Sequence, residues 1–260
     1  MVSSAAALTG QRQINKHIKR NLETMTTSIS DTRQTVLKAQ DLSKRVSSPE
    51  GQLTILDRVS LEVAEGESIA IVGASGAGKS TLLGLLAGLD VPTSGRVWLT
   101  SAEITALDED GRAALRADKV GFVFQSFHLV PSLNALENVM LPLELAGGED
   151  ARGASRKIID KVGLGDRWSH YPAQLSGGEK QRVAIARAFA TEPAVLFADE
   201  PTGNLDSRSG SNIMQLMFDL NRSSSTTLVL VTHDLSLAER CDRILSLDAG
   251  RLVSDTRSAA

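Results

Sequence analysis

The sequence predicts an α/β fold, and three observations carry this prediction. A short apolar strand, Ile69–Val72, runs into a glycine-rich segment and then into an apolar helical segment, Thr81–Leu86. A second apolar strand, Ala194–Ala198, ends in two consecutive carboxylates. Between these two units, over residues 126–174, the hydrophobic pattern becomes helical. Strands that alternate with helices are typical of an α/β core, and the helical stretch predicts a segment inserted into it.

The glycine-rich segment matches the pattern G-x-x-x-x-G-K-[ST] at every fixed position. Glycines allow a tight turn in which successive N–H groups point inward, and the following helix N-terminus adds a positive dipole end. In this motif Lys79 reaches the β- and γ-phosphates of a nucleotide, and Ser80 ligates Mg2+. The predicted phosphate-binding residues are Gly73, Ala74, Ser75, Gly76, Ala77, Gly78, Lys79, Ser80 and Thr81.

The two carboxylates at the end of the second apolar strand complement this loop. Asp199 is expected to hold Mg2+, and Glu200 to polarise an attacking water. Phosphoryl transfer requires mainly charge neutralisation and an oriented nucleophile, which these two groups would supply. An apolar strand that ends in two acids is common by itself, so its place behind a phosphate loop carries the interpretation.

A third motif, Leu175-Ser176-Gly177-Gly178-Glu179, has a physical reading of its own. Ser176 followed three residues later by Glu179 is a capping box, which predicts a helix over Lys180–Ala190. A plain helix cap is one interpretation of this motif, but Gln181 and Arg182 after it and the two nucleotide motifs on either side favour a further role. A serine hydroxyl, two glycine N–H groups and a helix dipole would also form a second phosphate platform, made by Ser176, Gly177, Gly178 and Glu179.

The other elements are predicted in chain order. Residues 35–125 are β-rich, with a short helix at Glu109–Ala117 and a strand at Val120–Phe124. The helical segment divides at Gly147-Gly148 into helices over Asn134–Leu145 and Ala151–Val162. The last part of the chain predicts a helix over Ser211–Leu220 and a strand over Thr226–Thr232.

From about Thr35 to about Val253 the chain resembles the ATP-binding subunits of ABC transporters, because Leu175–Glu179 is similar to the signature sequence of that family. The resemblance implies a P-loop NTPase core of the recA-like type, with an antiparallel β subdomain and an inserted α-helical subdomain. It implies a nucleotide-binding domain over residues 35–255, with the helical subdomain at about 126–174, after a flexible N-terminal extension over residues 1–34. It also implies that the signature faces ATP bound by a second copy of the chain.

Three more residues match motifs of the family. Gln125 corresponds to a glutamine that senses Mg2+ and water and begins the segment facing the membrane partner, and His233 to a histidine that contacts the γ-phosphate. Asp206, in Asn204-Leu205-Asp206, matches a loop that crosses the dimer interface beside the nucleotide. The resemblance therefore implies catalytic roles for Lys79, Gln125, Glu200 and His233, metal ligation by Ser80, Gln125 and Asp199, and a nucleotide-site role for Asp206.

One element of the family pattern is absent from the sequence. ABC subunits usually place an aromatic residue upstream of the phosphate loop to stack on adenine, whereas the first aromatic residue here is Trp98. Val46 lies near the expected position. We therefore predict that adenine is held by apolar contact, with weaker binding or weaker discrimination between bases.

Composition limits the remaining possibilities. The chain has 260 residues, of which 42% are hydrophobic, enough for one sizeable core. Its net charge of −3 and its scattered basic residues predict no nucleic-acid partner. The single cysteine, Cys241, excludes an internal disulfide and is expected to be a buried small hydrophobe. No apolar stretch is long enough to cross a bilayer, so a membrane path would belong to another chain.

The N-terminal segment, 1–34, contains no apolar core of a secretory signal, which predicts a cytoplasmic protein. Ile14, Ile18, Leu22 and Met25 form a thin helical stripe with basic residues between them. The stripe fits a membrane-surface helix, a mobile tail, or an upstream start site ahead of Met25.

Phe197–Asp206 and Leu136–Val139 are similar to the LolD and MacB branch of the family, and most of all to its YbbA-type members. That resemblance implies an ATPase that uses ATP and Mg2+, forms a symmetric dimer, and lies on the cytoplasmic face of the inner membrane. Its partner would be a MacB-, LolCE- or YbbP-like permease, which exports or extracts lipids, hydrophobic compounds or lipoproteins. A regulatory ATPase of the FtsE type, which signals to cell-wall enzymes, is the alternative. Soluble DNA-repair ATPases are disfavoured, because no sustained heptads separate the two nucleotide motifs.

Overall fold

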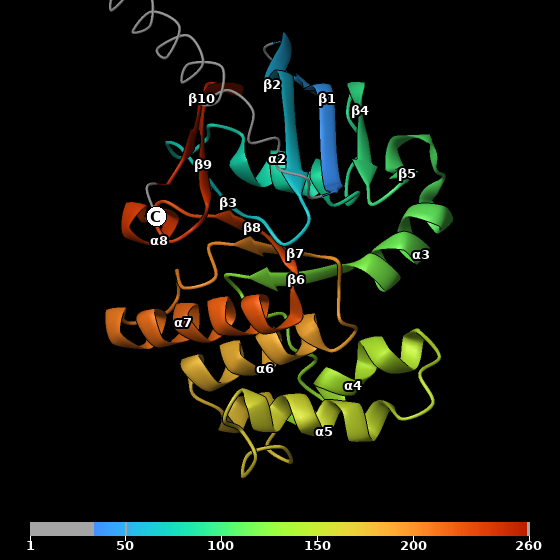
Figure 1. Ribbon diagram of the computed structural model, residues 1–260, viewed down its shortest axis with the longest axis vertical. Helices are drawn as coiled ribbons and strands as arrows, with labels where there is room; N and C mark the ends of the chain where they lie inside the picture. Colours follow the sequence, from blue (N-terminus) through green and yellow to red (C-terminus); the bar gives the residue numbers. More distant parts are fainter. Residues whose placement is uncertain (1–33, 50, 259–260) are drawn as a thin grey trace, which may run out of the picture. The chain divides into compact units, whose positions relative to one another are not determined.

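Figure 1 shows the computed structural model, which describes residues 34–49 and 51–258. Within these ranges the strands form two sheets. The smaller sheet has four antiparallel strands in the order β2-β1-β4-β5. Its strands are β1 (Thr35–Ser48), β2 (Gly51–Ala64), β4 (Ser94–Leu99) and β5 (Ala102–Glu103).

The larger sheet of the described residues has six strands in the order β10-β9-β3-β8-β7-β6. The pairs β9/β3, β3/β8, β8/β7 and β7/β6 are parallel, and β10 is antiparallel to β9. Carboxyl ends of parallel strands meet at one edge of a sheet, so the loops after β3, β6, β7 and β8 lie together there. The strands are β3 (Ser68–Val72), β6 (Val120–Phe124), β7 (Val195–Asp199), β8 (Thr227–Val231), β9 (Arg243–Asp248) and β10 (Arg251–Arg257).

Helix α2 (Lys79–Leu86) lies between the two sheets, as Figure 1 shows. Its buried leucines join one apolar cluster with residues of both sheets, including Leu42 of β1 and Phe197 of β7. All five residues of strand β3 are buried, and Ile69 and Ile71 join this cluster. The loop between β3 and α2 is therefore held from both ends by core packing.

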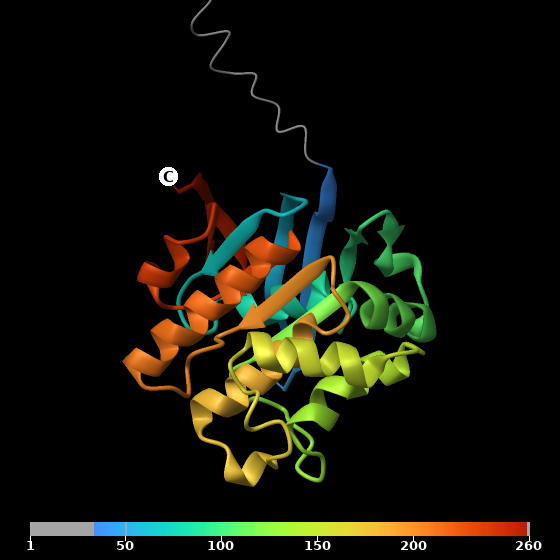
Figure 2. The same ribbon diagram turned by 60° about the horizontal axis from the view of Figure 1, so that its bottom comes forward.

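The opposite face of the larger sheet is covered by α6 (Gly177–Phe189) and α7 (Ser207–Ser224), with α4 (Ala135–Leu145) and α5 (Ala151–Lys161) beyond them (Figures 1 and 2). A second apolar cluster fills this layer and includes Leu196 and Ile185. An α/β core with an antiparallel sheet on one side and a group of helices on the other was predicted, and it is confirmed.

Shorter elements complete the chain, and side-chain caps set where several helices begin. Asp108 accepts a hydrogen bond from Gly111 N at the start of α3, and Asn134 and Glu137 form a capping box at α4. The remaining elements are α3 (Glu109–Lys119), α8 (Leu235–Ala238), and the 3-10 turns η1 (Ile104–Ala106) and η2 (Pro172–Gln174).

Two helices begin earlier than predicted. Helix α6 begins at Gly177, not at Lys180, because Ser176 is its N-cap and the two glycines already lie in the first turn. Helix α7 begins at Ser207, not at Ser211, because the Asp206 side chain accepts a hydrogen bond from Ser209 N. In both cases a polar N-cap side chain allows the helix to begin at residues with poor helix propensity, the glycines of α6 and the serines of α7.

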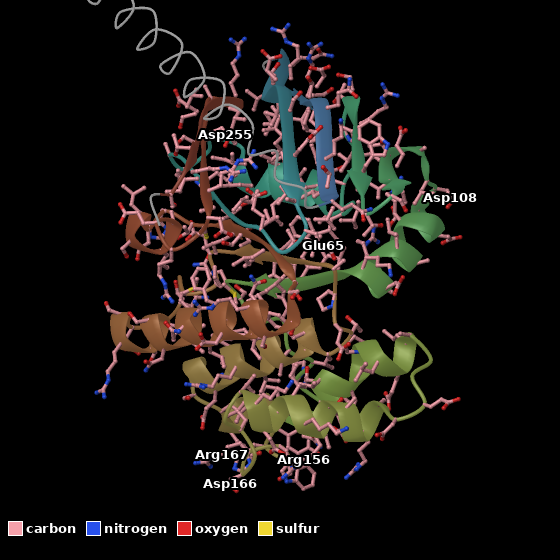
Figure 3. All side chains as sticks on the ribbon, viewed as in Figure 1. Glu65, Asp108, Arg156, Asp166, Arg167 and Asp255 are labelled. Atoms are coloured by element: carbon pink, nitrogen blue, oxygen red, sulfur yellow. The ribbon has the colours of Figure 1, made fainter. Side chains whose placement is uncertain are left out.

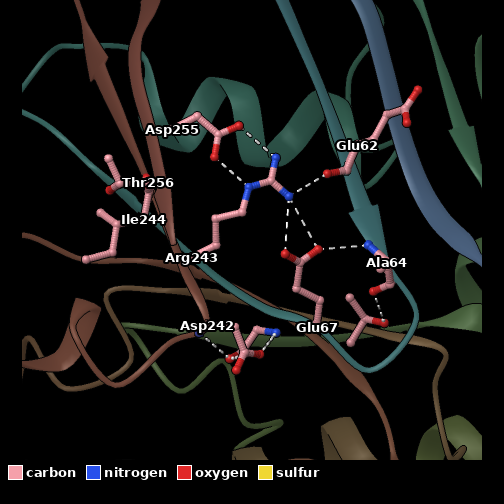
Figure 4. Close-up of polar contacts among 10 residues, drawn as sticks. Glu62, Ala64, Glu67, Asp242, Arg243, Ile244, Asp255 and Thr256 are labelled. Atoms are coloured by element: carbon pink, nitrogen blue, oxygen red, sulfur yellow. Dashed lines mark hydrogen bonds and ion pairs between the residues drawn. The ribbon is translucent and has the colours of Figure 1, made fainter. Parts of the chain in front are cut away.

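An ion-pair network fastens the two sheets together at the end distant from the phosphate loop (Figure 4). Arg243 donates to both oxygens of Glu67 at 3.2 and 3.4 Å, to the Glu62 carbonyl oxygen at 2.9 Å, and to Asp255 at 2.5 and 2.8 Å. These contacts join β2, β9, β10 and the turn before β3. Hydrogen bonding to Asp255 raises the pKa of Arg243, and the nearby Glu67 charge adds to that effect.

Charged side chains are distributed over distant parts of the described fold, with Asp108 at the start of α3, Asp255 on β10, and Arg156, Asp166 and Arg167 together near α5 (Figure 3). Cys241 is 1% exposed, which confirms the prediction of a buried small side chain. No helix within residues 34–258 is both long enough and apolar enough to cross a membrane. The predicted N-terminal stripe lies outside the described residues.

Candidate active site

The phosphate loop, residues 73–80, connects β3 to α2. Gly73 and Gly78 have φ values of 154° and 98°, in the region that favours glycine. A Cβ atom at Gly73 would collide with the Leu247 carbonyl oxygen, and one at Gly78 would lie 2.9 Å from the Ile55 carbonyl oxygen. Both glycines are therefore required for the loop to fit between β9 and β2. Ala74, Ser75 and Gly76 of the loop are exposed.

Lys79, the first residue of α2, points back into this loop. Its Nζ atom donates to the carbonyl oxygens of Gly73 at 2.9 Å and Ala74 at 3.0 Å. The ammonium group thus occupies the centre of the turn where phosphate oxygens would be received. A bound phosphate chain would replace these two carbonyls with charge-assisted partners, which are stronger acceptors.

Ser80 and Asp199 lie next to one another, although they are far apart in the sequence. The Ser80 hydroxyl donates to Asp199 Oδ1 at 3.4 Å. Burial raises the pKa of Asp199, the neighbouring Glu200 charge adds to the rise, and the Ser80 hydrogen bond and Lys79 oppose it. A cation placed beside Asp199 would relieve this tendency to protonate.

These two oxygen donors fit Mg2+, which prefers hard oxygen ligands and is usually bound by one or two protein groups together with phosphate oxygens and water. Within the described ranges no three His, Cys, Asp or Glu side chains gather at a common point that could hold a metal ion.

Glu200 and His233 form a pair at the carboxyl ends of β7 and β8. His233 Nδ1 lies 2.8 Å from Glu200 Oε2. Glu200 has a positive φ of 47°, and its N–H donates to the Val231 carbonyl oxygen at 2.9 Å, which ties the two strand ends together. A non-glycine residue in this conformation is uncommon, and such residues concentrate at functional sites.

A cavity of about 330 Å³ lies beside this pair. It is bordered by Glu200 and His233 on one side and by the start of α7 on the other. Asp206 borders the cavity as well, and hydrogen bonds from Ser209 lower the pKa of its carboxyl group. Asp206 is thus a helix cap that lines the same cavity as Glu200 and His233.

Gln125 follows β6, which pairs with β7, and so lies close to the acidic strand end. Its side chain donates to Asn204 Oδ1 at 3.3 Å, and Asn204 Nδ2 donates to the Gln125 carbonyl oxygen at 3.0 Å. A Cβ atom at Gly203 would lie only 2.7 Å from Gln125 Nε2. In the described contacts Gln125 is therefore held by the 203–204 turn and does not hydrogen bond to Ser80 or Asp199.

The Ser176–Glu179 platform begins α6, which lies on the opposite face of the larger sheet from α2 and the phosphate loop that precedes α2 (Figure 1). Glu179 accepts from Ser176 N and Ser176 Oγ, both at 2.8 Å, which confirms the capping box. These bonds lower the pKa of Glu179, and Arg167 lies 3.6 Å from the same carboxylate. Gly177 packs 3.3 Å from Leu205, measured from a Cβ placed on it. Gly178 has open space beside it, because the nearest atom to such a Cβ is Ser209 Cβ at 4.0 Å.

Val46 lies on β1 directly opposite Leu53 of β2. The two side chains are 38% and 53% exposed, a high value for a cross-strand apolar pair. Strand β2 continues from Leu53 to Ile55, whose carbonyl borders Gly78 of the phosphate loop. The pair therefore offers an apolar surface at the edge of the loop.

Sequence reasoning missed one buried polar residue in this region, Gln181. It is 0% exposed and hydrogen bonds to the backbone next to Glu200 and Gln125. A signal for it exists in the sequence, since helical spacing places Gln181 on one face with the apolar residues Ala184, Ile185 and Ala188. A single amide side chain on an otherwise apolar helix face indicates that its hydrogen bonds have a specific role.

Comparison with known proteins agrees with this geometry. The family model described as "ABC transporter" matches residues 56–203. The ABC transporter ATP-binding protein YbbA of Escherichia coli (strain K12) is 55% identical over 221 residues, which cover 84% of this chain and 97% of YbbA. The lipoprotein-releasing system ATP-binding protein LolD of Xanthomonas campestris pv. campestris (strain 8004) is 49% identical over 219 residues, covering 84% of this chain and 92% of LolD.

A similar solved structure is the dimeric post-hydrolysis state of the ATP-binding cassette MJ0796, bound to ADP and Pi. It is 40% identical, has a TM-score of 0.79, and the match covers 86% of this chain and 99% of that one. These comparisons confirm the predicted resemblance and do not favour the FtsE-type alternative. The chain belongs to the ABC transporter family, in the branch of YbbA and LolD, and is an ATP-hydrolysing subunit of that family.

Proposed function

We propose that two copies of this chain close head to tail over two ATP molecules and thereby drive a membrane permease. The observation that carries this proposal is the separation within one chain between the phosphate loop and the Ser176–Glu179 platform. Each of them suits phosphate, yet the platform packs against Leu205 and the start of α7. A twofold dimer would bring the platform of one copy to the nucleotide of the other. The MJ0796 cassette, which is dimeric and bound to ADP and Pi, supports this arrangement.

In each proposed site, one copy supplies the groups that hold and hydrolyse ATP. Lys79 and the N–H groups of the phosphate loop bind the phosphates, with Ser80 and Asp199 as ligands for Mg2+. When bound, Mg2+ would neutralise charge on the phosphate oxygens. Glu200 takes a proton from the attacking water, while His233 orients its carboxylate and contacts the γ-phosphate. The other copy of the chain contributes the serine and the glycine N–H groups of its Ser176–Glu179 platform.

Gln125 has a switching role in this proposal. Its hydrogen bonds to Asn204 hold it on the turn that follows Glu200. If released from Asn204, the Gln125 amide would be free to turn toward Asp199 and help to hold Mg2+ and the water there. The segment after Gln125, residues 126–129, borders a cavity of about 370 Å³ that also involves Pro172 and Lys180. We infer that the permease contacts the chain there, so that the nucleotide state reaches the membrane partner.

The partner is inferred from the relatives. YbbA is an ABC transporter ATP-binding protein, and LolD belongs to a lipoprotein-releasing system. We infer that this chain lies at the cytoplasmic face of the inner membrane, bound to a permease of the MacB, LolCE or YbbP kind. The work would be export of a hydrophobic compound, or extraction of a lipid or lipoprotein.

The proposal is tested by capturing the partner. A tagged Glu200→Gln chain is incubated with solubilised membranes of the source cells and ATP, and the bound proteins are identified by mass spectrometry. Co-purification of a permease with large outer domains, lost in a Lys79→Ala control, supports the proposal. Capture of a short permease with cell-division proteins would replace it with the regulatory alternative. Absence of any membrane protein would refute it.

A further inference from the structure

We propose that Gln181 is a positioning residue that couples the signature helix α6 to the hydrolytic groups of the same chain. This inference rests on the proposed function, because it assumes that the platform of α6 meets the partner's nucleotide. Gln181 lies in the second turn of α6, the helix that Ser176 caps. The inference gives α6 a second task, in addition to presenting the platform.

The contacts of Gln181 are specific. Its Nε2 atom donates to the Pro201 carbonyl oxygen at 2.6 Å and to the Phe124 carbonyl oxygen at 3.4 Å. Pro201 directly follows Glu200, and Phe124 directly precedes Gln125. One buried amide thus fixes the backbone beside the proposed general base and beside the proposed Mg2+ sensor.

A packing role alone does not explain an amide at this place. Gln181 is 0% exposed, and its Oε1 atom has no hydrogen-bond partner among the described residues. Leaving a buried acceptor unpaired is unfavourable, and an apolar side chain of similar length would avoid this cost. The retained amide indicates that its donor, aimed at two carbonyls, is what the site requires.

The backbone at Glu200 and the side chain of Gln125 keep their positions only if neighbouring residues hold them. Glu200 has a left-handed backbone conformation, with φ at 47°, which persists only where the surroundings enforce it. The turn that follows is packed tightly, since a Cβ atom at Gly203 would overlap Gln125. A small displacement of Pro201 would therefore change the direction of the Glu200 carboxylate and the position of Gln125.

Helix α6 can transmit a displacement from its Ser176 cap to Gln181, and thus to Pro201. From its Ser176 cap to Gln181 it advances five residues, about 7.5 Å at the usual rise per residue. Capping hydrogen bonds hold the start of this span, and the buried residues Gln181, Val183 and Ala184 anchor the helix at and just beyond its end. Engagement of Ser176 by the partner's nucleotide would shift the helix as a unit, and Gln181 would pass that shift to Glu200 and Gln125.

Two variants test the inference in the full chain. Gln181→Met keeps the length and removes the donor. Gln181→Glu restores a donor only while its carboxyl group is protonated, and burial should raise the pKa of that group above its ordinary value. Steady-state ATP hydrolysis gives kcat and KM across pH, each value divided by that of the unsubstituted chain at the same pH. This ratio removes the pH dependence that the variant and the unsubstituted chain have in common.

The expected result for Gln181→Met is a fall in kcat of about tenfold or more with unchanged KM and ATP binding, because alignment and not affinity is lost. Its thermal midpoint should change little, because the unpaired Oε1 acceptor is gone while the Pro201 carbonyl oxygen loses its donor. Gln181→Glu should approach the unsubstituted rate at low pH and fall toward the Gln181→Met rate as pH rises.

Unchanged kcat in Gln181→Met would overturn the inference. So would a pH-independent loss in Gln181→Glu with native stability. If Gln181→Met fails to fold, the pH dependence of Gln181→Glu still decides the matter. A failure of the proposed function is distinguished by size-exclusion chromatography of Glu200→Gln with ATP, because absence of a dimer there refutes the composite site, whatever the Gln181 variants do.

Discussion

Replacement of Arg243 by methionine should destabilise the fold severely, because this guanidinium neutralises a carboxylate that water barely reaches. The Glu67 side chain is 4% exposed, and its Oε1 atom lies 3.2 Å from Arg243 Nη1. Without Arg243, its remaining hydrogen bond comes from Ala64 N at 2.9 Å. Removing one partner of a buried pair typically costs about 3–5 kcal/mol. Asp255 is 39% exposed, so the loss of that second pair adds only about 0–1 kcal/mol.

The assay is urea-induced unfolding followed by circular dichroism, with the free energy of unfolding obtained by linear extrapolation. A matched control is Arg251→Met, since Arg251 is 65% exposed and pairs with Asp57 at 2.6 Å, and its loss should cost about 0–1 kcal/mol. Adding Glu67→Gln to Arg243→Met should recover much of the stability, because the unpaired charge is then gone. A loss below about 1 kcal/mol for Arg243→Met would refute the reasoning.

Four further predictions concern the site and the single thiol. Glu200→Gln should keep ATP binding and lower kcat by about 10²–10⁴-fold, as expected for loss of a general base, and retention of most activity would defeat that role. Lys79→Ala should weaken ATP binding itself, which calorimetry would detect. Because Val46 replaces a stacking aromatic ring, ATP and GTP should bind with similar strength, and a strong preference for ATP would count against the apolar contact. Burial raises the pKa of Cys241 from 9.0 to about 12. The raised pKa lowers the thiolate fraction about a thousandfold at neutral pH, so iodoacetamide should label Cys241 only after unfolding.

The elements with strong local signals were predicted well. The glycine pattern of the phosphate loop, the apolar strand before Asp199 and the capping box at Ser176 each depend on residues within a few positions of one another. Local hydrogen bonds and periodicity determine such features, so the sequence displays them directly. Even so, the first turns of α6 and α7 were predicted too late, although the Asp206 cap was visible as an acidic residue ahead of Ser209.

Features that depend on distant contacts were not predictable. The pairing of Arg243 with Glu67 joins segments far apart in the chain, and nothing near either residue specifies the other. The same holds for the hydrogen bonds between Gln125 and Asn204. The hydrogen bonds from Lys79 Nζ to the Gly73 and Ala74 carbonyl oxygens are a third case. They depend on the folded geometry of the turn, which its composition does not specify.

The composite site is tested most directly by complementation between two inactive chains. One carries Glu200→Gln, which removes the base and keeps the platform. The other carries Gly178→Asp, which places a negative charge on the platform and finds open space in its own chain, where the nearest atom to a Cβ lies at 4.0 Å. The two chains are co-expressed with different tags, and mixed dimers are isolated by sequential purification.

In a head-to-tail dimer, both lesions fall in one site and the other site is intact. The account therefore predicts that each variant alone is nearly inactive, whereas the mixed dimer hydrolyses ATP at about half the rate of the unsubstituted dimer. Activity of the Gly178→Asp chain by itself, or an inactive mixed dimer that still binds ATP, would contradict a site shared between two copies.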